Sequence, residues 1–145
     1  MIKVAHNTSN KFLELIRWNE WSDSKLPFIF TGYLLIAIKH PTTNFDAAIF
    51  LRILGFCFFY LAFGYLFNDW MDQKSDQIAG KTKYIHNWKP WQSIGILITF
   101  SFISFLFLLP LIRNYIILII MGLCYILAVT YSGTFLRFKE RGWVG

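Results

Sequence analysis

The residues best suited to chemistry lie in one short polar segment, 68–76, which follows a long apolar run. Three carboxylates lie in this segment, those of Asp69, Asp72 and Asp76, and Asn68 adds an amide at its start. At about 100° per residue, a helix would place these four at roughly 0°, 100°, 40° and 80° around its axis, so that their oxygens share one face. Oxygen ligands grouped in this way suit Mg²⁺, which keeps several waters and is usually completed by substrate phosphates. The segment therefore predicts a Mg²⁺ site for a phosphate or diphosphate.

A plain alternative for this segment is an acidic, solvated helix end without a ligand. Carboxylates at the C-terminus of a helix are unfavourable, because they face the negative end of the helix dipole. A bound cation would compensate both that dipole and the mutual repulsion of the carboxylates. Ionisable groups at the edge of a membrane are also functional more often than not. We therefore favour a cation site over a solvated helix end.

The composition indicates an integral membrane protein, since 56% of the residues are hydrophobic and 20% are aromatic. Residues 91–112 and 114–136 carry no charge, and residues 47–67 are interrupted only by Arg52. Each of these runs is long enough to cross a hydrocarbon core of about 30 Å. The apolar run 26–38 is shorter, and by length alone it could be re-entrant or interfacial. The sequence therefore predicts three secure membrane spans and a fourth candidate near the N-terminus.

A second group of polar residues follows the last apolar run. It contains Tyr131, Ser132, Arg137, Lys139 and Arg141, with Gly142 directly after them. Basic residues that flank a span on the cytoplasmic side are common and need bind nothing. Arg can, however, hold phosphate oxygens with two parallel hydrogen bonds, and Lys can act as a point charge. The group could therefore bind a diphosphate opposite the carboxylates.

Two motifs together indicate a family. The pattern Asn-Asp-x-x-Asp-x-x-x-Asp at 68–76, placed after an apolar helix, resembles the first aspartate-rich motif of the UbiA-type intramembrane prenyltransferases. The Tyr-Ser pair at 131–132, followed by Arg-x-Lys-x-Arg-Gly at 137–142, resembles the segment after the fourth helix of that family. The resemblance covers most of the chain.

The resemblance implies an all-α fold, a transmembrane bundle of about four helices similar to the first half of the family's fold. The run near the N-terminus then becomes a first span, and residues 1–145 form a single membrane domain. The expected spans are about 22–39, 47–68, 91–112 and 114–134.

The implied activity is transfer of an isoprenyl group from a polyprenyl diphosphate to an acceptor, with Mg²⁺ as the cofactor. The expected metal-site residues are Asn68, Asp69, Asp72 and Asp76. The expected diphosphate-binding residues are Lys81, Tyr131, Ser132, Arg137, Lys139 and Arg141. Asn19 and Lys25, at the start of the first helix, are candidates for the same cavity. Aromatic candidates for the cavity wall are Tyr60, Phe63, Tyr65 and Phe67.

The sequence contains one aspartate-rich motif, whereas members of the family have about nine helices and a second such motif. We therefore expect this chain to supply half of an active site, as a fragment, a truncated product or one component of a split enzyme. Whether it is an enzyme by itself stays open. A complementing second half or a further copy is an expected partner. The alternative is a non-catalytic membrane module or subunit that binds lipid phosphates or a partner protein.

The basic residues predict the orientation in the membrane. In a four-span arrangement, eleven of the fourteen Lys and Arg residues fall on one side. Lys39, Arg52 and Arg113 would lie on the other side. Lys and Arg are retained in the cytoplasm, so both termini and the aspartate-rich segment should be cytoplasmic, and we expect a bacterial inner membrane. The net charge of +6 is explained by this flanking pattern and by anionic lipid, so we expect no nucleic-acid partner.

Cysteine labelling tests this topology. In a background without Cys57 and Cys124, single cysteines at positions 80 and 143 should react with an impermeant reagent only from the cytoplasmic face. A cysteine at position 43 should react only from the opposite face. Labelling of positions 80 and 143 from opposite faces would exclude four spans.

Overall fold

The computed structural model describes residues 8–39, 46–113 and 115–133, and within these ranges the regular structure is helical throughout. The longer helices are α2 (Trp18–Lys39), α3 (Ala47–Met71), α5 (Pro90–Leu108) and α6 (Tyr115–Ser132). The shorter ones are α1 (Thr8–Leu15), α4 (Gln73–Ile78) and the 3₁₀ turns η1 (Tyr84–Asn87) and η2 (Leu109–Leu111). The predicted all-α helical membrane bundle is confirmed.

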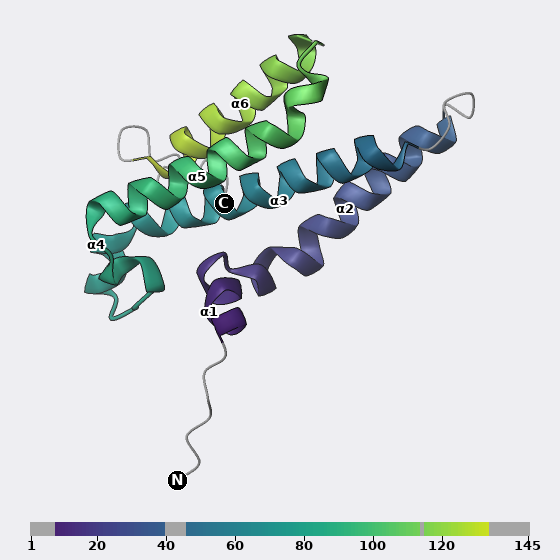
Figure 1. The fold of residues 1–145 in the computed structure, drawn as a ribbon. Helices are drawn as coiled ribbons and strands as arrows, with labels where there is room; N and C mark the ends of the chain where they lie inside the picture. Colours follow the sequence, from purple (N-terminus) through teal and green to yellow (C-terminus); the bar gives the residue numbers. More distant parts are fainter. Residues whose placement is uncertain (1–7, 40–45, 114, 134–145) are drawn as a thin grey trace.

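Helix α5 lies alongside α3, whereas α2 runs at an angle to α3 and approaches it near the connection between the two helices (Figure 1). The most extensive packing of α3 is with α5, and it makes smaller contacts with α6 and α2. Among the described residues, three segments are long and apolar enough to cross a membrane, namely Ala47–Met71, Pro90–Leu111 and Tyr115–Ser132. The predicted first span is also helical, within α2, but this helix carries Glu20, Asp23 and Lys25 and is not among those three. Whether α2 crosses the membrane therefore stays a prediction.

Local sequence explains where the helices around the polar segment begin and end. Asp46 caps α3, because its carboxylate accepts the backbone N–H groups of Ala48 and Ile49 at 2.8 and 3.1 Å. Asp72 separates α3 from α4 but keeps helical spacing, since its own N–H donates to the carbonyl of Asn68 at 2.9 Å. Gly80 stops α4 in a left-handed conformation, with φ of 69°, which glycine adopts at little cost.

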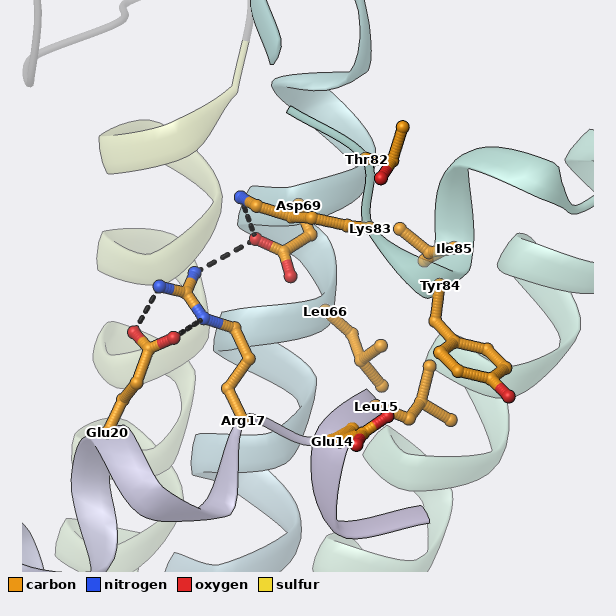
Figure 2. A pocket seen from close by; sticks show the side chains of 10 residues that line it. All are labelled: Glu14, Leu15, Arg17, Glu20, Leu66, Asp69, Thr82, Lys83, Tyr84 and Ile85. Carbon is orange, nitrogen blue, oxygen red and sulfur yellow. Dashed lines mark hydrogen bonds and ion pairs between the residues drawn. The ribbon is translucent and has the colours of Figure 1, made fainter. Parts of the chain in front are cut away.

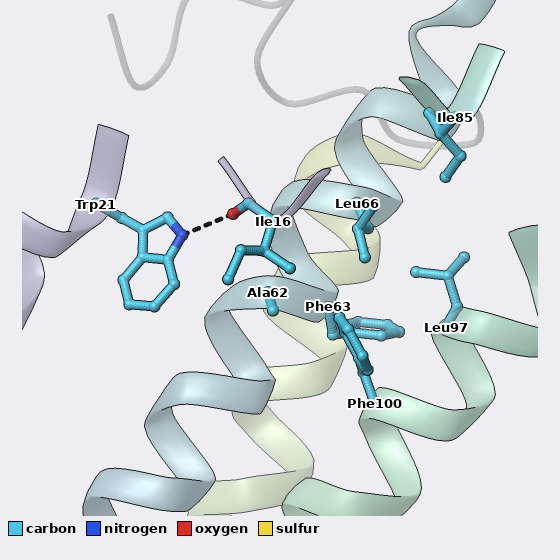
Figure 3. Packing of buried hydrophobic residues seen from close by; sticks show 8 residues of the cluster. All are labelled: Ile16, Trp21, Ala62, Phe63, Leu66, Ile85, Leu97 and Phe100. Carbon is cyan, nitrogen blue, oxygen red and sulfur yellow. Dashed lines mark hydrogen bonds between the residues drawn. The ribbon is translucent and has the colours of Figure 1, made fainter. Parts of the chain in front are cut away.

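The buried core lies at the end of α3 that carries the polar segment (Figure 3). Leu66 and Ala62 of α3 are fully buried in one cluster with Trp21 of α2 and with Ile16, which lies between α1 and α2. The Trp21 indole N–H donates to the carbonyl of Ile16 at 2.8 Å, which satisfies the one polar group of this large side chain. This core fixes the N-terminal helices against the start of the aspartate-rich motif.

One glycine controls how closely α3 and α5 approach. A Cβ added to Gly55 would overlap the ring of Phe107, and that ring is stacked on Phe59. A Cβ added to Gly95 of α5 would meet no atom within 4 Å. The free backbone face at Gly55 therefore permits the close contact of the two helices.

We expect Gly55→Ala to destabilise the bundle by about 1–3 kcal/mol, because the added methyl group must displace a packed ring. Gly95→Ala is the matched control and should be neutral or slightly stabilising. Unfolding of both variants by denaturing detergent measures the difference. Equal stability of the two variants would contradict this packing.

Candidate functional site

A pocket of about 580 Å³ lies beside the end of α3, and it gathers five of the predicted site residues. They are Lys25 from α2, Asn68 from α3, Asp72 at the junction of α3 and α4, and Tyr131 and Ser132 from α6. Arg17, Tyr60, Leu61, Gly64, Tyr65 and Ala128 complete the lining. The lining therefore combines polar and charged groups with apolar and aromatic side chains.

Asn68 is fixed by a contact between two long helices. Its side-chain oxygen accepts a hydrogen bond of 3.0 Å from the hydroxyl of Ser132, which is 4% exposed. The two residues are 64 positions apart in sequence, so this bond ties the end of α3 to the end of α6. The first residue of one motif thus contacts the second residue of the other. The sequence predicted both residues, and the structure brings them together.

Asp69 does not line the larger pocket, and its carboxylate has two basic partners. Its side chain is almost fully buried, and Oδ1 accepts hydrogen bonds from Arg17 Nη1 at 2.9 Å and from Lys83 Nζ at 2.6 Å. These residues line a smaller pocket of about 250 Å³, shown in Figure 2. A buried carboxylate requires such partners, because an isolated buried charge is very costly.

Asp76 shares the lysine with Asp69. Lys83 Nζ lies 2.9 Å from Asp76 Oδ2, and His86 Nε2 lies 3.6 Å from the same oxygen. Burial favours the neutral acid of Asp76, but the bond to Lys83 and the nearby positive charges outweigh it and lower the pKa of Asp76 below its ordinary value. Burial likewise opposes the charge on Lys83, yet its bonds to Asp69 and Asp76 raise the pKa of Lys83. Lys83 therefore remains an ammonium that pairs with two carboxylates.

The predicted common face is thus divided into two halves. Asn68 and Asp72 are neighbours on the helical projection and line the larger pocket. Asp76 and Asp69 are neighbours in the same projection and meet Lys83. Within the described ranges, no three His, Cys, Asp or Glu side chains form a group that could hold a metal ion. The chain's own cations thus balance half of the predicted metal-binding set.

The remaining predicted residues are placed less centrally. Asn19 and Lys81 are exposed, and neither lines the two pockets described above. Arg137, Lys139 and Arg141 lie outside the described residues. Among the aromatic candidates, Tyr60 and Tyr65 line the larger pocket. Two aromatic candidates, Phe63 and Phe67, lie outside its lining, with their rings stacked on each other and centroids 5.8 Å apart.

Sequence reasoning missed the two basic partners of Asp69. Arg17 was counted only among the basic residues that flank the membrane, and Lys83 was interpreted either as a contact to diphosphate or as ordinary charge in a cytoplasmic loop. Lys83 lies 14 positions after Asp69 and Arg17 lies 52 positions before it, so only the folded chain brings them together. A weak signal was available, since a buried carboxylate next to a membrane span must find a basic partner.

The long apolar helices define an integral membrane protein, and a pocket lined by polar and aromatic residues lies beside the end of α3. A sequence profile of the UbiA prenyltransferase family matches residues 25–145, and the chain therefore belongs to this family. The predicted family membership is confirmed. No curated protein matches the chain, and no solved structure matches it. All residues of the larger pocket except Arg17 fall inside the matched region.

The shared lysine leads to a stability prediction. Lys83→Met should lower the free energy of unfolding by about 1–3 kcal/mol, because it leaves Asp69 and Asp76 close together without their common counter-ion. Lys74→Met is the control, since Lys74 is exposed on the neighbouring helix α4. Unfolding in detergent at neutral pH measures both variants. A loss no larger than that of Lys74→Met would show that the bridge does not stabilise the fold.

Proposed function

We propose that this chain binds the diphosphate of a polyprenyl diphosphate together with Mg²⁺, as part of an intramembrane prenyltransferase. The observation that carries the proposal is the shared pocket of Asn68, Asp72, Tyr131 and Ser132, which joins the two family motifs at one site. Family membership supports the reaction class. Both termini would be cytoplasmic, so that the diphosphate would enter from the cytoplasmic side.

The oxygen donors fit a hard divalent cation. Asn68 and Asp72 offer an amide and a carboxylate oxygen at one pocket, which suits an ion that keeps several waters and takes its remaining ligands from phosphate. Bound Mg²⁺ would supply neutralisation of the diphosphate as it leaves. In this arrangement Asp69 and Asp76 support the site indirectly, since each pairs one carboxylate oxygen with Lys83.

Other pocket residues suit the two ends of the substrate. Lys25 provides a positive charge and Tyr131 a hydroxyl for phosphate oxygens. The apolar wall of Leu61, Gly64 and Ala128 suits an isoprenyl chain. The ring of Tyr60 can stabilise an allylic cation, because aromatic rings attract cations through their quadrupole. An acceptor would then capture the cation.

A second candidate is a non-catalytic membrane module that binds lipid phosphates or a partner. The balance of Asp69 and Asp76 by internal cations favours it, because fewer carboxylates are left for metal. Large apolar side chains also stay exposed on α2 and α6, and these would contact lipid, a complementing half or a further copy. Prenyl transfer on addition of a complementing second half would favour the enzyme, and phosphate binding without transfer would favour the module.

Substitution of the pocket carboxylate tests the proposed site. Asp72→Asn should abolish Mg²⁺-dependent binding of a prenyl diphosphate, because it removes the one charged oxygen donor of the predicted metal set that lines the pocket. Lys74→Gln changes an exposed neighbour and should have much less effect. Binding of radiolabelled farnesyl diphosphate across a Mg²⁺ titration measures both. Unchanged Mg²⁺ dependence in Asp72→Asn would mean that the metal binds elsewhere.

A further inference from the structure

Arg17 is a charged residue of the pocket that lies outside both motifs and outside the matched region 25–145. It is located between α1 and α2 with φ of 53°, and it is the only described non-glycine residue with a positive φ. Side chains other than glycine seldom adopt this conformation. The turn is held by buried neighbours, since Ile16 and Trp21 are fully buried and joined by a hydrogen bond. The fold therefore keeps Arg17 in an unusual backbone position.

The guanidinium of Arg17 is fixed on three sides. Nη1 donates to Asp69 Oδ1 at 2.9 Å, Nε donates to Glu20 Oε1 at 2.6 Å, and Nη2 donates to Glu20 Oε2 (Figure 2). The guanidinium carbon also lies 5.1 Å from the centre of the Tyr65 ring, a favourable cation–π distance. A guanidinium held in this way needs little further ordering to bind a ligand.

Two donors of Arg17 remain for a ligand. A guanidinium has five N–H groups, and three are used by Glu20 and Asp69. One N–H on Nη1 and one on Nη2 have no hydrogen-bond partner in the part of the chain that the structure describes. Arg17 lines the larger pocket together with Asn68 and Asp72, and it also lines the smaller one. The side chain therefore stands between the Asp69 cluster and the proposed diphosphate site.

We propose that Arg17 is an additional diphosphate-binding residue, whose remaining N–H groups donate to phosphate oxygens in the larger pocket. This inference rests on the proposed function, because it names a further ligand contact at the same site. Planar guanidinium donors match phosphate oxygens in a way that an ammonium group does not. Asp69 and Glu20 then act as positioning residues, which hold the guanidinium at the pocket. The N-terminal helices thus contribute directly to substrate binding.

The competing explanation is that Arg17 only attaches α1 to the bundle through Asp69. Two variants separate these roles. Arg17→Lys keeps the positive charge but removes the fork of donors. Ile16→Ala keeps Arg17 but removes a fully buried side chain that docks the N-terminal segment. Arg113→Lys is the matched control for the substitution, since Arg113 is exposed and lines neither pocket.

The experiment uses the full chain in phosphatidylcholine nanodiscs. It measures the dissociation constant of farnesyl diphosphate at saturating Mg²⁺, and amide hydrogen exchange over residues 8–15 as a record of α1 docking. We expect Arg17→Lys to weaken binding about tenfold, as for loss of one charge-assisted hydrogen bond, and Arg113→Lys to bind like the native chain. If the two variants show the same amide exchange over residues 8–15, Arg17→Lys should have a higher dissociation constant for farnesyl diphosphate than Ile16→Ala.

The outcomes separate this inference from the proposed function. If the native chain shows no Mg²⁺-dependent binding of farnesyl diphosphate, the proposed function fails and this inference fails with it. If the native chain binds and Arg17→Lys binds equally well, only the role of Arg17 is overturned. It is also overturned if affinity falls only in proportion to the loosening of α1, as it would in Ile16→Ala.

Discussion

The ion pairs of Asp69 are the interaction on which the arrangement of the site depends. Asp69 lies near the C-terminal end of α3 and is 3% exposed, so its negative charge must be balanced. Arg17 and Lys83 supply the opposite charge. The first partner ties the N-terminal helices to α3, and the second ties the loop before α5 to the same point. One acidic side chain therefore joins three segments that are far apart in sequence.

The ion pairs also separate the acidic residues of the motif at 68–76 into two groups with different contacts. Lys83 lies against both Asp69 and Asp76, which leaves Asn68 and Asp72 as the oxygen donors at the larger pocket. Ser132 holds the amide of Asn68 and so places α6 beside that pocket. The four residues that the sequence analysis predicted as one cluster therefore form two separate pairs in the folded chain. Asp69 and Asp76 pair with Lys83, whereas Asn68 and Asp72 line the larger pocket.

Much of the fold was predictable because long uncharged runs leave few alternatives to membrane helices. The meeting of Asn68 with Ser132 was also predictable, since two motifs of one family were expected to share a site. The roles of Arg17 and Lys83 were not, because charge counting treats every basic residue near a membrane as equivalent. Helical angles placed Asp76 beside Asp69 correctly, but they could not show which side chain would lie between them. Pairing across 52 positions depends on tertiary packing, which no local pattern encodes.

In the proposed site, Asp72, and not Asp69, provides the carboxylate for the metal. Mn²⁺ can replace Mg²⁺ as a paramagnetic probe, because oxygen ligands suit both ions. Electron–nuclear double resonance of Mn²⁺, bound with farnesyl diphosphate to chain labelled with ¹³C in its aspartate carboxylates, detects the carboxylate that contacts the ion. The account predicts a strong carboxylate coupling that disappears in Asp72→Asn and persists in Asp69→Asn. Loss of the coupling in Asp69→Asn with retention in Asp72→Asn would contradict it.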